Sequence, residues 1–420
     1  MPGDSSHTAR ADADADAGGG PPGPPRDQES VTRPRVAIVT QHWGSGLDEL
    51  TEATRLVAGA LARRAEVDVV HLHAPPEPAS TLRDSVFDVH SVPLHGARPL
   101  RASLLRAALA VHDGGRSVPA PAAALLTELE GSAPEVAGVL RRLAPDAVVL
   151  AGHRQPWDVG ALGRRGAPGS PRVVLLPFTA DATVLRSAAV ARLLARSDAV
   201  GTAHSGEQCA LLETVEEGAS GHIRPLGLGV GVNRSAAANR LFGVRFFGAY
   251  VLTIRSFPPG GARWERSVTH EVLRSTVGDV SIAEVDGETW RIGDRENTLE
   301  LPVSPSRVNL WRLMAHAIAT VDLRPPGPVG REAIESLLLG TPVVVPEGSA
   351  AQEHAADANG GLWYRDDGEL IDAVRVLTDR RLRDRLAVQG KSWAEHHHGD
   401  MDDFVERTAS LVLGSLAGTS

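Results

Sequence analysis

The sequence predicts an α/β protein made of two successive doubly wound domains, and three observations support this fold class. Short apolar runs rich in Val, Ile and Leu alternate with segments of helical periodicity along most of the chain. A Gly-rich stretch at 223–233 divides this alternation into two series. The length of 420 residues is enough for two cores. Strands that alternate with helices form parallel sheets covered on both faces.

Before the first series lies a tail at 1–33 that contains an Asp-Ala repeat followed by Gly- and Pro-rich sequence. Such a segment buries too little apolar surface to offset the entropy of ordering it, so we expect it to be unstructured. The Asp-x-Asp triplets in the repeat have no flanking strand, and we interpret their likeness to a metal-binding motif as chance.

The N-terminal domain is predicted over 34–235. Its strands are short β-branched runs, which are typical of strands buried in a parallel sheet. The helices between them show apolar residues spaced three or four apart. We predict strands at 35–40, 67–72, 147–150, 173–176 and 199–203, and helices at 47–64, 102–111, 134–143 and 183–195.

The C-terminal domain is predicted over 236–420 by the same two patterns, and its last helix is a candidate to pack back on the N-terminal domain. We predict strands at 250–254, 280–285, 318–323, 342–345 and 362–364, and helices at 309–317, 331–339, 369–377, 379–388 and 401–413. Two such domains leave a cleft beyond the carboxyl ends of their strands, where ligands of these folds bind.

Composition limits the partners. A net charge of -9 argues against a nucleic-acid partner, which requires a basic face. Lys391 is the only lysine, so anion contacts elsewhere must come from Arg. The single Cys209 fits a reducing compartment and is expected to be a small buried residue. Neither a signal peptide nor a transmembrane segment is visible, so we expect a cytoplasmic protein, with peripheral contact to the inner face of the membrane left open.

The most informative segment is 326–345, which has a Gly/Pro loop, a helix, a tight Gly turn and a strand. Gly327 and Gly330 allow the backbone to approach a ligand, and the free amides at the helix start form an anion site. Glu335 lies one turn into the helix, where it can accept hydrogen bonds from ligand hydroxyl groups. The competing interpretation is a solvated helix with Glu332 and Glu335 as surface charges.

This segment resembles the signature of the family 4 retaining glycosyltransferases, which have the GT-B fold. Six residues match in register, and the similarity is clearest over 318–390; the matching residues are Gly330, Glu335, Gly340, Pro342, Val343 and Val344. The resemblance implies that Glu335 binds the ribose of a nucleotide sugar. The first Glu of the family pair, which contacts the donor sugar, falls on Gly327 here.

A second part of the resemblance lies after the first strand of the C-terminal domain. Arg255 aligns with the family's diphosphate-binding Arg, but Gly260 stands where the family has Lys. A missing cation near a diphosphate removes stabilisation of the leaving group. Either another Arg, such as Arg263 or Arg324, replaces it, or the chain is a weak or inactive member.

In the N-terminal half, Gly44 and Gly46 follow the first strand, and the resemblance implies that this loop approaches the donor phosphates and the acceptor. A structural turn is the alternative. His153 ends a predicted strand and should face the cleft, where it either orients an acceptor hydroxyl or donor sugar or is a hydrogen-bonded structural residue. His396, His397 and His398 lack an identifiable coordinating partner, so we expect a solvated loop before the last helix.

The resemblance implies transfer of a sugar from a nucleotide-diphosphate sugar to an acceptor with retention of configuration, without a metal or other cofactor. Glu335 and His153 are the predicted catalytic residues. The predicted donor site comprises Arg255, Gly327, Gly330, Glu335, Gly44 and Gly46. The acceptor, whether a sugar, a lipid or a small molecule, is not specified. The main alternative is an inactive GT-B paralogue that binds or scaffolds; a nucleotide-sugar epimerase and a dinucleotide-dependent oxidoreductase follow.

Overall fold

The fold was analysed in a computed structural model of the whole chain. Residues 33–420 form one compact unit. The structure describes residues 33–41, 43, 49–73, 86–93, 134–152, 159–163, 165–178, 186, 188–202, 206–215, 222–241, 244, 248–256, 280–286, 289–293, 298–301, 306–324 and 329–414.

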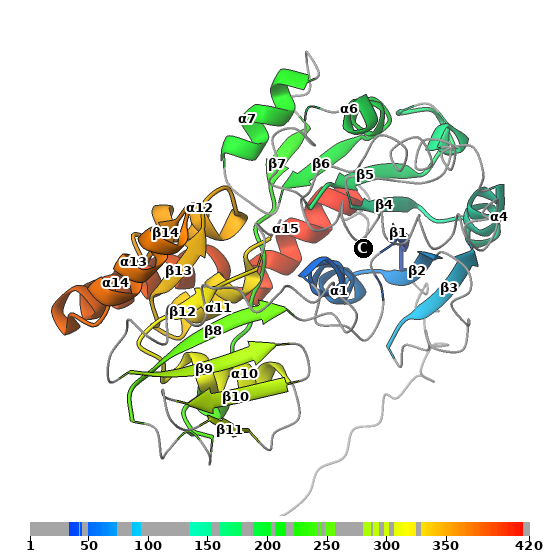
Figure 1. Cartoon of the computed structure of the whole chain (residues 1–420). Coiled ribbons are helices and arrows are strands. Elements are labelled where there is room, and N and C mark those ends of the chain that lie inside the picture. The colour runs from blue at the N-terminus through cyan, green and yellow to red at the C-terminus, as the bar shows by residue number, and fades with distance from the viewer. Residues whose placement is uncertain are drawn as a thin grey trace, which may run out of the picture. The chain divides into compact units, whose positions relative to one another are not determined.

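The first half of the chain forms a seven-stranded sheet in which every strand pairs in parallel with its neighbours (Figure 1). The strand order is β3-β2-β1-β4-β5-β6-β7. The strands are β1 (Arg35–Thr40), β2 (Glu66–His73), β3 (Asp88–Pro93), β4 (Ala147–Ala151), β5 (Arg172–Leu176), β6 (Ala199–Thr202) and β7 (Ile223–Pro225). The sequence did not indicate β3 or β7, because both lack a continuous apolar run.

Alternate residues of each strand enter two different cores. On β1, Val36 and Ile38 join the core that contains α1, whereas Ala37 and Val39 join the core formed with α4, α6 and α7. This alternation follows from the two-residue period of a strand. The helices of this half are α1 (Glu49–Ala62), α4 (Pro134–Leu143), α6 (Ala188–Leu194) and α7 (Gly206–Val215), with a 3-10 turn at Val159–Leu162.

A crossover at 226–233 leads to the short helix α8 (Arg234–Ala237) and the second half. Leu226, Leu228 and Val230 in this crossover are buried. The Val230 amide donates to the His398 carbonyl at 3.0 Å, and the His398 ring Nδ1 lies 2.9 Å from the Leu228 carbonyl. The crossover is therefore tied to the end of a helix 170 residues later in the chain.

The second sheet also has seven strands, in the order β11-β10-β9-β8-β12-β13-β14. These are β8 (Tyr250–Ser256), β9 (Ser281–Asp286), β10 (Thr289–Gly293), β11 (Thr298–Glu300), β12 (Thr320–Asp322), β13 (Val343–Pro346) and β14 (Gly361–Tyr364). β9, β8, β12, β13 and β14 are parallel, as predicted, but β10 is antiparallel to both β9 and β11. This antiparallel meander is an addition that the sequence analysis did not foresee.

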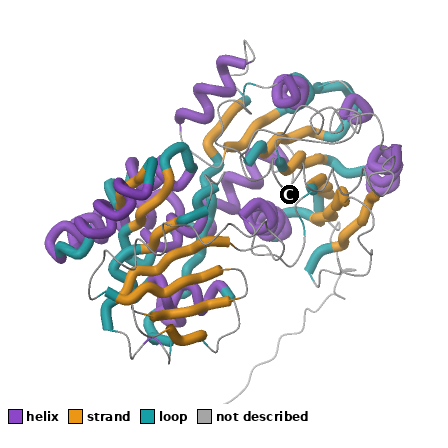
Figure 2. Tube along the Cα trace, viewed as in Figure 1, coloured by secondary structure: helices purple, strands orange, loops and turns teal. Residues whose placement is uncertain are grey.

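Helices cover both faces of the second sheet, as Figure 2 shows. They are α10 (Arg307–Met314), α11 (Arg331–Leu338), α12 (Ala350–Asp357), α13 (Asp367–Val376) and α14 (Arg380–His398). The loop expected at His396, His397 and His398 is wrong, because α14 continues to His398 and buries that side chain. The helix continues because Gly390 and Ala394 pack against the second half, beyond the predicted end at residue 388.

The last helix, α15 (Met401–Leu413), packs on the first sheet, against β4, β5 and β6 and beside α1 (Figure 1). A side chain at Gly201 of β6 would lie 2.6 Å from Leu411, and one at Gly229 would lie 2.6 Å from Phe404. These glycines allow α15 and the crossover to approach closely. One core cluster therefore runs from β1 and α1 through α15 to α11 and β13.

Candidate functional site

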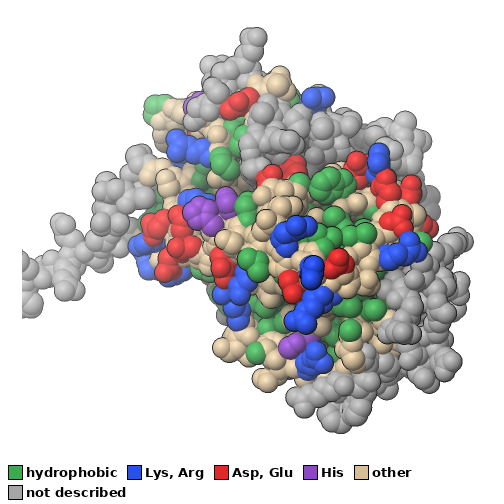
Figure 3. Space-filling model, turned by 90° about the vertical axis from the view of Figure 1, so that its left-hand side faces the viewer, with side chains coloured by type: hydrophobic (Ala, Val, Ile, Leu, Met, Phe, Trp, Pro, Cys, Tyr) green, Lys and Arg blue, Asp and Glu red, His purple; other side chains and the backbone are tan. Residues whose placement is uncertain are grey.

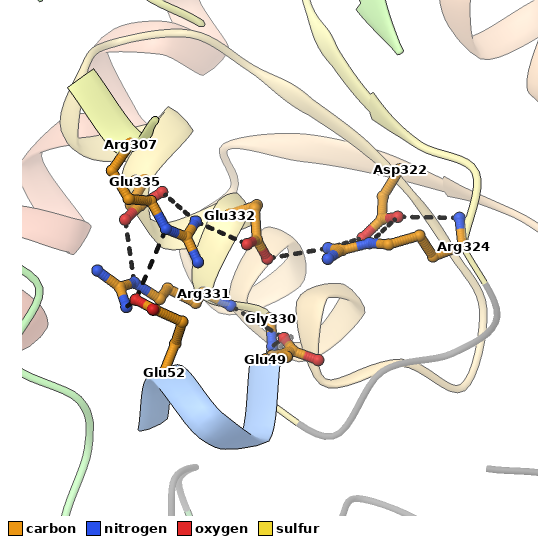
Figure 4. Close-up of polar contacts among 9 residues, drawn as sticks. All are labelled: Glu49, Glu52, Arg307, Asp322, Arg324, Gly330, Arg331, Glu332 and Glu335. Carbon is orange, nitrogen blue, oxygen red and sulfur yellow. Dashed lines mark hydrogen bonds and ion pairs between the residues drawn. The ribbon is translucent and has the colours of Figure 1, made fainter. Parts of the chain in front are cut away.

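The topology of both sheets indicates where a ligand site lies. The strand order reverses between β1 and β4 in the first sheet, and between β8 and β12 in the second. Ligands of open α/β sheets bind beyond the carboxyl ends of the strands at such a switch point. The helix that follows β1 is α1, and the helix that follows β12 is α11. The N-terminal ends of these two helices meet in the structure (Figure 4).

The start of α11 is built around Gly330. This residue has a φ of 68°, in the left-handed region that favours glycine. A Cβ atom there would lie 2.8 Å from the Ala351 amide nitrogen and 3.0 Å from the His354 ring. Gly330 therefore lets the loop turn into α11 while it presses against the start of α12.

The first amides of α11 bind a carboxylate from the other half. The Gly330 amide donates to Glu49 Oε1, and the Arg331 amide donates to the same oxygen at 3.2 Å. Glu49 is the first residue of α1. Amides at a helix start have no partner within the helix and carry its positive dipole end, so they hold anions well. The amides at which the sequence predicts an anion site therefore hold a side chain of the protein itself.

Burial acts on the Glu49 carboxyl more than its partners do. The pKa of Glu49 is raised to about 7. Desolvation contributes most to this rise, Arg324 opposes it, and the negative charges of Glu332 and Asp322 add to it. Near neutral pH this carboxyl therefore exists in both its protonated and its ionised form.

Two carboxylates of α11 are buried among guanidinium groups. The side chains of Glu332 and Glu335 are 1% and 0% exposed, so the interpretation of both as solvated surface charges is wrong. Arg307 Nη1 donates to Glu332 at 2.7 Å and to Glu335 at 3.0 Å. Arg331 Nε donates to the other Glu335 oxygen at 3.0 Å. Both oxygens of Glu335 therefore already accept charge-assisted hydrogen bonds.

Arg331 also connects the two halves. Its Nη1 pairs with Glu52, which lies one turn after Glu49 on α1. Arg307 Nε approaches the same Glu52 carboxylate at 3.8 Å. α1 therefore contributes two acidic side chains to α11, one to its backbone amides and one to its first side chain (Figure 4).

A third guanidinium completes the cluster on the β12 side. Arg324 binds Asp322 through Nε at 2.8 Å and Nη2 at 2.7 Å, and Nη2 also reaches Glu332 at 2.9 Å. Burial alone would raise the pKa of Glu332, but Arg324 and Arg307 hold it far below its usual range. Within the described residues of the cluster, five carboxylates face three guanidinium groups; they are Glu49, Glu52, Asp322, Glu332 and Glu335, with Arg307, Arg324 and Arg331.

The structure brings two of the predicted site residues together, Glu335 and Gly330. Arg255, at the end of β8, instead forms a 2.7 Å ion pair with Glu284 on β9. The other predicted residues lie outside the part of the chain that the structure describes; they are His153, Gly327, Gly44 and Gly46. Of the two cations considered for the position of Gly260, Arg324 joins the cluster and Arg263 also lies outside the described residues.

Sequence reasoning missed Glu49, Glu52 and Arg307 as parts of the site. A signal for the first two exists, because acids at positions i and i+3 in the first turn of a helix share a face. Arg307 carries no such signal, since only the fold brings α10 beside α11.

Two other features bear on where a ligand binds, namely metal-binding groups and cavities. The described residues contain no group of three His, Cys, Asp or Glu side chains able to hold a metal ion. A cavity of about 860 Å³ lies at the opposite, amino-terminal ends of β4 and β5, lined among others by Leu140, Arg141, Leu162 and Arg172. We favour the helix-start cluster, because strand topology places ligands at the carboxyl edge.

The distribution of surface charge and the helix lengths do not indicate a further binding site among the described residues. On the face shown in Figure 3, acidic and basic side chains are interspersed among the described residues. No described helix is both long and apolar enough to cross a membrane.

Comparisons with known proteins identify the fold. No family model matches the sequence, and a search of curated proteins gives no match. HepE from Anabaena, solved in complex with UDP and glucose, matches with a TM-score of 0.57 and 15% identity over 90% of this chain and 98% of that chain. Sucrose-phosphate synthase from Thermosynechococcus elongatus matches with a TM-score of 0.61 and 15% identity, over 92% of this chain and 100% of that chain. WaaG, a glycosyltransferase involved in lipopolysaccharide biosynthesis, matches with a TM-score of 0.55 and 14% identity, over 90% of this chain and 100% of that chain. The chain therefore has the GT-B fold, with two α/β units whose sheets are wholly or mostly parallel.

Proposed function

We propose that this chain transfers a sugar from a nucleotide-diphosphate sugar to an acceptor, with retention at the anomeric carbon. The observation that carries the proposal is the start of α11, where the Gly330 and Arg331 amides hold an anion at the switch point of the second sheet. The structural neighbours support it, since HepE is described in complex with UDP and glucose. The resemblance of 318–390 to family 4 supports the finer assignment.

In the proposed reaction, an acceptor oxygen bonds to the anomeric carbon while the bond from that carbon to the distal phosphate oxygen breaks. The phosphate oxygen keeps the electron pair, and the acceptor proton passes to the released nucleoside diphosphate. The developing negative charge needs preorganised positive groups. We assign this task to the α11 amides with Arg324 and Arg307, in place of the lysine that is absent at Gly260, so the proposal requires no metal.

Glu335 is proposed to bind the ribose and Arg255 the diphosphate, with Gly327, Gly44 and Gly46 lining the donor site and His153 facing the reacting sugar. A carboxylate has about four acceptor positions, and the described contacts of Glu335 occupy two. Glu335 also positions the Arg307 and Arg331 side chains through these hydrogen bonds. The loss of one carboxylate therefore affects both the donor and the cluster.

Calorimetric titration with UDP-, GDP- and ADP-sugars tests the proposal. One nucleotide sugar should bind wild-type protein, and Glu335→Gln should weaken it by about tenfold or more, since a charge-assisted contact contributes more than 1.4 kcal/mol. Glu369→Gln makes the same substitution in an exposed ion pair with Arg365 and should leave binding unchanged. Unchanged affinity in Glu335→Gln, with the fold intact, removes Glu335 from the site.

Two intramolecular contacts favour a second function. The α11 amides already hold Glu49, and Arg255 is paired with Glu284. A GT-B paralogue that binds or scaffolds without transfer would keep such contacts permanently. This alternative would be established if the protein binds a nucleotide but transfers no sugar to any acceptor tested. The contact between Glu49 and the α11 amides would then be the same with and without the nucleotide.

A further inference from the structure

One carboxylate occupies the position that the proposed function assigns to the donor phosphate. Glu49 Oε1 accepts from both the Gly330 and the Arg331 amides. A carboxylate and a phosphate oxygen are chemically similar ligands for helix-start amides. Two anions cannot share one pair of amides, so Glu49 and a bound phosphate exclude each other there.

This carboxylate comes from the opposite half of the molecule, 281 residues earlier in the sequence than Gly330. It begins α1, directly beyond the switch point of the first sheet. Glu52, one turn further along, pairs with the Arg331 side chain. Release of Glu49 from the amides would leave the Glu52–Arg331 ion pair as the remaining described polar contact between these two helices.

The surroundings of Glu49 favour its exchange. Two acidic groups among the described residues act on it from other elements, namely Asp322 at the end of β12 and Glu332 on α11. Arg324 offsets them, but it is already bound to Asp322 and Glu332. Burial and these acidic groups raise the pKa of Glu49 to about 7. Its ionised form is therefore less favourable near neutral pH than that of an ordinary exposed carboxylate.

We propose that Glu49 is a built-in competitor of the donor diphosphate, which must displace its carboxylate from the α11 amides and thereby break one of the two described polar contacts between α1 and α11. The identity of the displacing ligand as a nucleotide sugar rests on the proposed function. The displacement by a phosphate-type anion rests on the Glu49 contact alone.

The test compares pyrophosphate binding by wild type and Glu49→Gln in isothermal titration calorimetry at pH 8 and pH 6. At pH 8, Glu49 is mostly ionised and competes, so Glu49→Gln should bind pyrophosphate about tenfold tighter. At pH 6 most of the wild-type protein has a protonated Glu49, and the ratio should fall below about threefold. Titration of pyrophosphate itself affects both proteins equally and cancels in this ratio.

Two further variants control for charge and for folding. Asp402→Asn removes one acidic charge from the exposed surface of α15 and should leave the affinity for pyrophosphate at the wild-type value at both pH values. Glu49→Asp keeps the charge but shortens its reach by one methylene, so it should also bind pyrophosphate more tightly than wild type. If Glu49→Gln does not fold, Glu49→Asp carries the test.

The outcomes separate the two proposals. Equal pyrophosphate affinity of wild type, Glu49→Gln and Glu49→Asp at pH 8 overturns the competitor role, even when a nucleotide sugar binds all three. Tighter pyrophosphate binding by the variants, with no affinity for UDP-, GDP- or ADP-sugars, supports the competitor role and contradicts the proposed function. Tighter binding of both ligands supports both.

Discussion

At the scale of single residues, Gly330 decides how closely the loop before α11 approaches α12. Its φ of 68° and the contact of an added Cβ with the Ala351 backbone, at 2.8 Å, are two separate obstacles to any side chain. The first costs about 1–2 kcal/mol and the second about 1–3 kcal/mol.

Gly330→Ala should therefore lower the free energy of unfolding by about 2–5 kcal/mol, measured by urea denaturation. Gly348→Ala is a matched control, because Gly348 has a φ of 75° but open space around its Cα. The control should lose only about 1–2 kcal/mol. Equal losses in the two variants would contradict the proposed collision with α12.

Glu49 gives the stability a distinctive dependence on pH. Its pKa rises from its ordinary value near 4.5 to about 7 on folding, so the folded state binds a proton more tightly than the unfolded state does. Between those two values, stability attributable to this group falls as pH rises. Glu332, whose pKa is lowered, acts in the opposite direction, and its contribution is lost only as pH falls below about 4.5.

Thermal and urea denaturation of wild type and Glu49→Gln at pH 5 and pH 8 should reveal this dependence. Relative to wild type, the variant should gain about 2 kcal/mol in free energy of unfolding between pH 5 and pH 8. The variant lacks the titrating group, and all other groups contribute to both proteins alike. A constant difference between the two proteins would show that Glu49 keeps its ordinary pKa.

At the scale of elements, α14 lies against α11 and the start of β14 through two glycines. A Cβ on Gly390 would lie 2.6 Å from Leu337 and 2.9 Å from the Gly360 Cα atom. This close approach seats the long helix that the sequence analysis ended ten residues early, at 388 instead of His398. Tertiary packing extends α14 beyond the segment whose local pattern predicts a helix.

Gly390→Ala should lower stability by about 1–3 kcal/mol, because the backbone of Gly360 cannot yield as a flexible side chain does. Gly59→Ala is the control, since Gly59 also lies within a helix but has nothing within 4 Å of an added Cβ. Alanine there should stabilise the protein by about 0.5–1 kcal/mol. Denaturant midpoints with unchanged slopes report both effects. A gain in both variants would refute the close packing of α14.

At the scale of the whole molecule, the sequence sufficed for the two series of strands and helices, because continuous apolar runs and helical periodicity are local patterns. Of the site it indicated Gly330 and Glu335, which belong to one contiguous motif. It did not indicate the contact from Glu49 and Glu52 to that motif, because this pairing depends on how α1 meets α11. The strands β10 and β11 were missed, since they are short and partly polar.

One buried cluster joins both sheets through α15, so the described halves should unfold together. Phe404 is fully buried in this cluster, and its loss should cost about 3–5 kcal/mol. Far-UV circular dichroism and tryptophan fluorescence should give one shared urea transition for wild type and two separated transitions for Phe404→Ala. Val388→Ala, at a site 69% exposed on α14, should behave like wild type. A single shared transition in Phe404→Ala would show that α15 does not couple the sheets.

The chain passes between its two halves twice, at 226–233 and again between α14 and α15, and His398 fastens these passages to each other. Because a hydrogen bond joins the two passages, they form a single connection between the halves. The described halves are therefore joined at separate polar contacts, among them one between His398 and Leu228 and one between Glu49 and the start of α11.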